Sequence, residues 1–112
     1  MSIDAEKTVQ LRRYELVEGV FDEFVEWFQA RIVPAREAEG FAVEFAYADR
    51  EAGEFVWAVS VAGDAATFAA VEEAYLASDS RAAAFADQPK RVAASHVRLI
   101  EPVVPAGART AR

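Results

Sequence analysis

Hydrophobic residues in this chain follow two different periods, and the order in which these periods alternate constrains the fold most strongly. Every-second-residue alternation, typical of half-buried strands, is found in residues 9–17, 41–48, 54–61 and 95–103. The segments that start at Phe21 and Asp64 instead carry apolar residues three and four positions apart, as amphipathic helices do. The predicted order of elements is therefore β-α-β-β-α-β.

This order is typical of an α+β fold of the ferredoxin-like type, in which one antiparallel four-stranded sheet has its helices on one face. Pro34 lies late in the first helix and lacks the N–H that would bind a carbonyl, so we expect a kink or a shortened last turn. We expect Asp64 to cap the second helix and either Ser78 or Asp79 to cap a short extra helical turn.

Length and composition indicate one globular domain. With 112 residues and 54% apolar side chains, the chain can form one ordinary core. We expect the domain to span residues 9–104, between a flexible stretch at 1–8 and a disordered tail at 105–112.

Charge and cysteine content argue against several function classes. The net charge of −7 would repel a phosphate backbone, so we expect no nucleic-acid partner. The absence of cysteine excludes disulfides and thiolate chemistry. No apolar stretch approaches the roughly 20 residues that span a bilayer, and no leader peptide is visible, so we expect no membrane contact and a cytoplasmic location.

Alternation also sorts the strand side chains onto two faces of the sheet. We expect the bulky apolar side chains under the helices, with Phe45 opposite Trp57 and Tyr47 opposite Phe55. We expect Val9 and Leu11 there as well, because an unpaired charge beneath helices costs several kcal/mol, about what burial of one or two large apolar side chains contributes. The polar side chains predicted on the bare face are Gln10, Arg12, Tyr14, Glu44, Ser60, His96 and Arg98.

A bare sheet face of this size usually meets a partner. The simplest partner is a second copy related by a two-fold axis. Two sheets facing each other would enclose a lumen lined by these polar side chains, so we predict a homodimer with the site inside it.

A family resemblance supports this architecture. Over roughly residues 8–104 the chain resembles NIPSNAP-type domains, on the residues Leu11, Arg12, Tyr14, Gly19, Phe24, Pro34 and Gly40. The segments "EFVWAVSVAGD", "EEAYLASDSRAAAF" and "HVRLIEPV" resemble the third strand, the second helix and the last strand of these domains. The resemblance implies a dimeric α/β barrel. Bacterial members mostly lack an assigned activity, and wider relatives include cofactor-free monooxygenases, cyclases, isomerases and haem-binding enzymes, so the fold does not select one function.

The candidate chemistry lies in a few side chains. His96, the only histidine, could be a general acid or base, or a hydrogen-bonded interface residue. Arg12 and Arg98 could hold an anionic ligand, or form a structural ion pair with Glu44. Tyr14 could polarise a carbonyl or only fill the barrel.

These residues predict a small homodimeric barrel that binds a small anionic or aromatic molecule in its lumen. If the protein is an enzyme, acid–base or cofactor-free oxygenase or isomerase chemistry would suit His96 and Tyr14 as catalytic groups. The ligand would then be held by Arg12, Arg98, Glu44, Ser60 and Gln10. We expect no cofactor, and no metal because no ligand spacing is present. The alternative is a non-catalytic scaffold whose lumen residues form a salt-bridge network.

Overall fold

A computed structural model describes residues 6–104 of the chain; the predicted tail at 105–112 and residues 1–5 lie outside the described residues. The strands are β1 (Lys7–Leu16), β2 (Ala42–Asp49), β3 (Glu54–Ala62) and β4 (Val92–Ile100). The helices are α1 (Phe21–Trp27), the π-helix η1 (Phe28–Ile32), α2 (Val33–Ala38), α3 (Ala65–Leu76) and α4 (Asp79–Phe85). The first strand begins at Lys7, so residues 7 and 8 belong to the sheet and not to the predicted flexible stretch.

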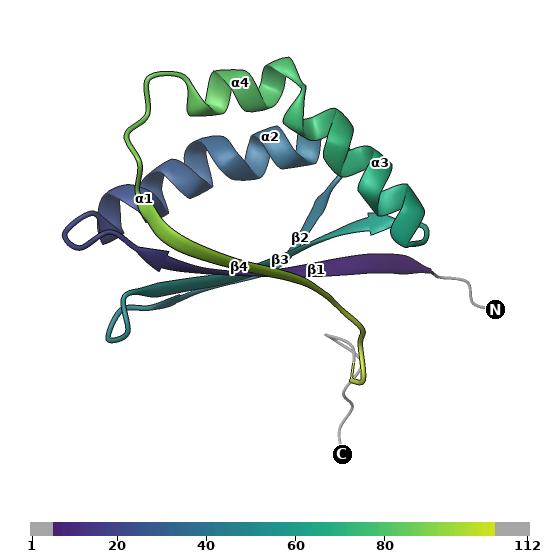
Figure 1. The fold of residues 1–112 in the computed structure, drawn as a ribbon, viewed down its shortest axis with the longest axis horizontal. Helices are drawn as coiled ribbons and strands as arrows, with labels where there is room; N and C mark the ends of the chain where they lie inside the picture. The colour runs from purple at the N-terminus through teal and green to yellow at the C-terminus, as the bar shows by residue number, and fades with distance from the viewer. Residues whose placement is uncertain (1–5, 105–112) are drawn as a thin grey trace.

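The four strands form one sheet in the order β2-β3-β1-β4, and every neighbouring pair is antiparallel. All the helices lie on one face of this sheet, and the other face is open (Figure 1). The predicted ferredoxin-like α+β fold is therefore confirmed. No helix within residues 6–104 combines the length and the apolar character needed to cross a bilayer.

The first helical segment is continuous from Phe21 to Ala38 but changes its winding in the middle. The π-helical turn Phe28–Ile32 ends two residues before Pro34, the second residue of α2. A proline ring clashes with the carbonyl four residues earlier, and the wider winding of a π-turn relieves that clash. The helix therefore widens and continues past Pro34, where the sequence predicted a kink or a shortened turn.

Side-chain caps begin the later helices as predicted. The Asp64 carboxylate accepts a hydrogen bond from the Thr67 N–H at 2.9 Å, at the start of α3. Ser78 caps α4 by accepting from the Arg81 N–H at 3.1 Å, and its hydroxyl also donates to the Tyr75 carbonyl at 2.7 Å. Ser78 thus joins the end of α3 to the start of α4.

The core lies between the helices and the sheet. Its largest fully buried side chains are Trp57 and Val59 of β3, Phe24 of α1 and Tyr75 of α3. Phe28 contacts both Phe55 and Trp57 edge-to-face, with ring centroids 4.8 Å apart in each pair. Edge-to-face aromatic packing therefore joins the π-turn to the centre of the sheet.

The predicted pairing of the hairpin was wrong beyond Val43. Val43 lies opposite Val59 as expected, but the register shifts by one residue at Glu44, so that Phe45 lies opposite Ala58. This β-bulge turns Phe45 and Tyr47 to the open face, where they are 37% and 69% exposed. They are not part of the core.

The predicted faces of β1 were also wrong. Arg12 lies opposite Trp57, and Tyr14 lies opposite Phe55. Trp57 and Phe55 are both buried beneath the helices. Gln10, Arg12 and Tyr14 therefore lie on the helix-covered face. Val9 and Leu11 lie on the open face instead.

Candidate functional site

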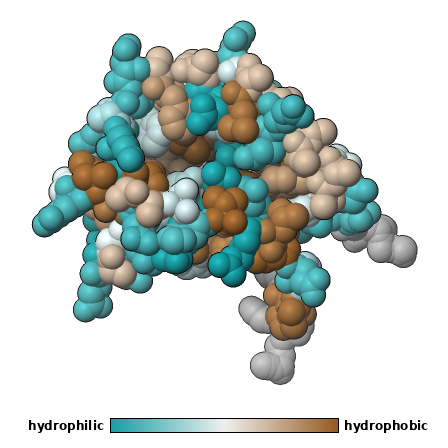
Figure 2. All heavy atoms as spheres, in the orientation of Figure 1, coloured by the Kyte–Doolittle hydropathy of each residue, from teal (hydrophilic) through white to brown (hydrophobic). Residues whose placement is uncertain are grey.

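A cavity of about 220 Å³ lies between the helices and the sheet. Figure 2, which looks onto the β4 side of the molecule, shows a hollow between the helix layer and β4. The cavity is lined by Arg12, Tyr14, Phe24, Trp27, Phe28, Ile32, Arg36, Trp57, Tyr75, Leu76, Arg81, Phe85, Val92 and Ser95. Pockets for drug-sized ligands measure roughly 300–1,000 Å³, so this one suits a smaller molecule.

The lining is aromatic and positively charged. It contains three arginines, Arg12, Arg36 and Arg81, and no acidic residue. This is unusual in a chain with a net charge of −7. Guanidinium groups with aromatic walls favour a planar molecule that carries an anionic group.

Arg12 reaches the cavity from β1. Its Nε donates to the Tyr14 hydroxyl at 2.9 Å, and Nη1 donates to the Gln10 side-chain oxygen. The guanidinium lies 5.6 Å from the Trp57 ring centroid. Within residues 6–104 no carboxylate lies within hydrogen-bond distance of Arg12, because the nearest contact, to Glu72, is 3.9 Å long. Arg12 is thus oriented by neutral groups and is open to an anion.

Arg36 forms the deepest charged group of the wall. Its side chain is 5% exposed, and Nη1 donates to a Glu72 carboxylate oxygen at 2.9 Å. The guanidinium lies over the rings of Tyr75, at 4.2 Å, and Phe41, at 4.6 Å. A buried charge needs a partner, and Glu72 supplies it.

Tyr75 adds a hydroxyl to the same wall. Burial raises the pKa of this phenol above its ordinary value, although Arg36 and Arg81 oppose the change. The hydroxyl therefore remains protonated near neutrality and can donate a hydrogen bond. Together with Tyr14, it gives the cavity two phenols among its cations.

Trp27 and Phe85 form the part of the wall between α1 and α4. Their rings meet edge-to-face at 5.0 Å, and the Trp27 indole donates to the Ala84 carbonyl at 2.9 Å. The Arg81 guanidinium lies 4.2 Å from the Phe85 ring. Among residues 6–104 no carboxylate lies within 4 Å of Arg81. This guanidinium is therefore also open to an anion.

The remaining predicted site residues lie on the opposite face of the sheet. His96 pairs with Arg13 and Arg98 with Leu11, while Glu44 and Ser60 bond each other at 2.6 Å. The predicted lumen required His96, Arg12 and Tyr14 to lie on the same face of the sheet. The structure instead places His96 on the face opposite Arg12 and Tyr14. The individual roles assigned to these residues stay predictions.

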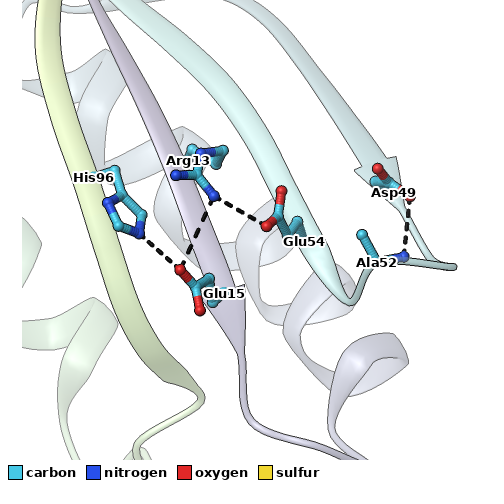
Figure 3. A network of polar contacts seen from close by, with 6 residues as sticks. All are labelled: Arg13, Glu15, Asp49, Ala52, Glu54 and His96. Atoms are coloured by element: carbon cyan, nitrogen blue, oxygen red, sulfur yellow. Dashed lines mark hydrogen bonds and ion pairs between the residues drawn. The ribbon is translucent and has the colours of Figure 1, made fainter.

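His96 takes part in a polar network on the open face (Figure 3). Its Nε2 lies 2.8 Å from a Glu15 carboxylate oxygen. Arg13 lies 4.0 Å from Glu15 and donates to Glu54 at 3.0 Å. The network links β4, β1 and β3 across the open face.

Glu44 forms a second polar cluster on that face. It accepts hydrogen bonds from the Ser60 hydroxyl at 2.6 Å and from the Lys7 ammonium at 2.9 Å. The Ser60 bond, aided by Lys7, lowers the pKa of Glu44 despite partial burial. Within residues 6–104 of one chain, Glu44 therefore forms its ion pair with Lys7, and no arginine lies within 4 Å of its carboxylate.

Sequence reasoning missed Arg36, Arg81 and Glu72 as site residues. One available signal was helical spacing, because Arg36 follows Ile32 by four residues and so lies on the buried stripe of its helix. The same spacing marks Glu72, four residues after Phe68, and Arg81, four residues before Phe85. It could not show that α3 and α4 meet at the cavity, because only the tertiary arrangement brings them there.

The fold is the ferredoxin-like α+β fold that solved structures of NIPSNAP domain proteins and of antibiotic biosynthesis monooxygenase-like proteins share. No family model matches the sequence, and no curated protein matches it.

The chain is similar in structure to several solved proteins. A NIPSNAP family protein from Agrobacterium tumefaciens superposes with a TM-score of 0.78 at 11% identity, over 93% of this chain and 92% of that chain. An uncharacterized NIPSNAP domain protein from Burkholderia xenovorans gives 0.73 at 15%, over 87% and 95%. A candidate antibiotic biosynthesis monooxygenase from Bacteroides thetaiotaomicron gives 0.68 at 17%, over 95% and 97%. At such identities the likeness extends to the fold and not to an activity.

Proposed function

We propose that this protein binds a small aromatic anion in the cavity between its helices and its sheet. The observation that carries this proposal is the lining, which has three arginines and no acid among aromatic walls. Arg12 would bind the anionic group, because no carboxylate within residues 6–104 lies within hydrogen-bond distance of its guanidinium. The rings of Trp27, Trp57 and Phe85 would pack against the planar part of the ligand.

The lining residues also limit which reactions the cavity could catalyse. It has hydrogen-bond donors in Tyr14, Tyr75 and the arginines, but no His, Asp, Glu or Lys side chain to take a proton. If the cavity is catalytic, these donors would stabilise a developing oxyanion, and the ligand would supply its own ionised group. Binding is therefore the primary proposal, and catalysis is secondary.

Calorimetric titration with benzoate at neutral pH tests the proposal. We expect Arg12→Gln to weaken benzoate binding about tenfold or more, because a hydrogen bond to a charged group contributes about 1.5–3 kcal/mol. Arg98→Gln is the matched comparison, since it makes the same change on the opposite face of the sheet. We expect it to leave the affinity unchanged. Loss of binding in Arg98→Gln with full binding in Arg12→Gln would reject the cavity and favour a lumen between copies.

We also propose that a second copy of the chain covers the open face. Apolar side chains lie there without cover, with Phe45 and Ile100 each 37% exposed and Tyr47 69% exposed. The polar network of Arg13, Glu15, Glu54 and His96 supplies both signs of charge, so the face can complement its own copy across a two-fold axis. In this arrangement the network sets the register of the dimer, which is the role that the scaffold alternative gives it.

A further inference from the structure

Glu72 is the only carboxylate of residues 6–104 that contacts the cavity arginines. It lies on α3, outside the lining, and its side chain is 22% exposed. One oxygen bonds Arg36 at 2.9 Å, and the other lies 3.9 Å from Arg12. Glu72 therefore stands directly behind two of the three guanidinium groups that face the cavity.

The two contacts of Glu72 are unequal. The contact with Arg36 is a hydrogen-bonded ion pair, whereas the contact with Arg12 exceeds hydrogen-bond length. Arg12 can therefore turn to a ligand without breaking a bond to Glu72, while Arg36 remains neutralised. At the end of the cavity next to Glu72, the charges of Arg12, Arg36 and Glu72 sum to a single positive charge, and Arg81 makes no contact with Glu72 within 4 Å.

We propose that Glu72 is a specificity-determining residue that limits this end of the cavity to a singly charged group. The proposal rests on the function proposed above. One anionic group on Arg12 completes the charge balance. A second anionic group on the same ring edge would meet the field of Glu72 at a distance of a few ångströms in a partly buried setting, where like charges repel strongly.

Titration with benzoate and with isophthalate at neutral pH tests this, because both are fully ionised there and differ by one carboxylate. The wild type should prefer benzoate. We expect Glu72→Gln to change the ratio of the two affinities roughly tenfold in favour of isophthalate, since removal of one nearby charge has an effect of this order. If Glu72 had a purely structural role, Glu72→Gln would weaken the binding of both ligands equally and leave the ratio of the two affinities unchanged.

Two further variants complete the experiment. Glu73→Gln makes the same charge change on the neighbouring residue of α3, which is exposed, and should leave the ratio at its wild-type value. Glu72→Asp keeps a carboxylate for Arg36 but withdraws it from Arg12. Glu72→Asp should change the ratio of the two affinities in favour of isophthalate by about twofold. This variant replaces Glu72→Gln in the experiment if Glu72→Gln does not fold.

The outcomes separate the two proposals. If the wild type binds benzoate but neither Glu72 variant changes the ratio, the role of Glu72 is rejected and the binding function stands. If the wild type binds neither acid, the binding function is rejected, and the role of Glu72 with it. A shift of equal size in Glu73→Gln would show that overall charge, and not the position of Glu72, sets the preference.

Discussion

A charged side chain is stable beneath the helices when neutral partners surround it. Arg12 achieves this with the Tyr14 hydroxyl, the Gln10 amide and the face of Trp57. These contacts largely offset the free-energy cost of removing the Arg12 guanidinium from water, which was the reason for expecting Arg12 on the bare face. Alternation along β1 separates its two side-chain sets correctly, but it does not say which set faces the helices, since both contain apolar and polar residues.

Glu44 and Ser60 give a pH prediction at the residue scale. The pKa of Glu44 is depressed below its ordinary value of 4.5, so its contribution to stability is present above that value and is lost as the pH falls through the folded-state pKa. We expect Ser60→Ala to lower the free energy of unfolding by about 1–2 kcal/mol at neutral pH, through loss of a hydrogen bond to a charged group.

Urea denaturation of both proteins across the acid range measures this effect. The difference between wild type and Ser60→Ala should shrink as the pH falls below the ordinary carboxylate value. A difference that stays constant with pH would mean that Ser60 acts through packing and not through the Glu44 carboxylate.

At the scale of single elements, strand and helix positions could be predicted because each follows a clear hydrophobic period. The bulge at Glu44 could not, since no glycine or proline marks residues 42–48. A shift of one residue turns every later side chain to the other face, and this accounts for Phe45 and Tyr47. The π-turn before Pro34 likewise depends on how the helix relieves a clash, which periodicity does not describe.

The cap of α4 gives a prediction at this scale. Ser78→Ala removes the acceptor for the Arg81 N–H and the bond to the Tyr75 carbonyl. We expect about 1 kcal/mol of destabilisation in urea denaturation. Because α4 carries Arg81 and Phe85, benzoate binding should weaken as well. Ser78→Gly should cost less than Ser78→Ala if capping is the cause, as glycine is tolerated at this position, and an equal or greater cost would contradict it.

At the scale of the whole molecule, the apolar residues left on the open face predict self-association. Ile100→Glu places a charge on this face and should give a monomer in analytical ultracentrifugation, because a buried unpaired charge is costly at an interface. Val97→Glu is the matched control. It lies on the same strand, is 43% exposed against 37% for Ile100, and points to the helix side.

The Val97→Glu variant should keep the oligomeric state of the wild type. A wild-type protein that sediments as a monomer would reject the proposed dimer outright. Equal dissociation by both variants would place the contact at the β4 edge and not on the open face.

The cavity lies between the helices and the sheet of one chain, and the open face is the other side of that sheet. A lumen on a two-fold axis would offer one central chamber to two subunits, whereas this arrangement gives each subunit a chamber of its own. Saturation should therefore occur at one benzoate per polypeptide, with a simple hyperbolic isotherm, and Ile100→Glu should retain that stoichiometry after the subunits separate.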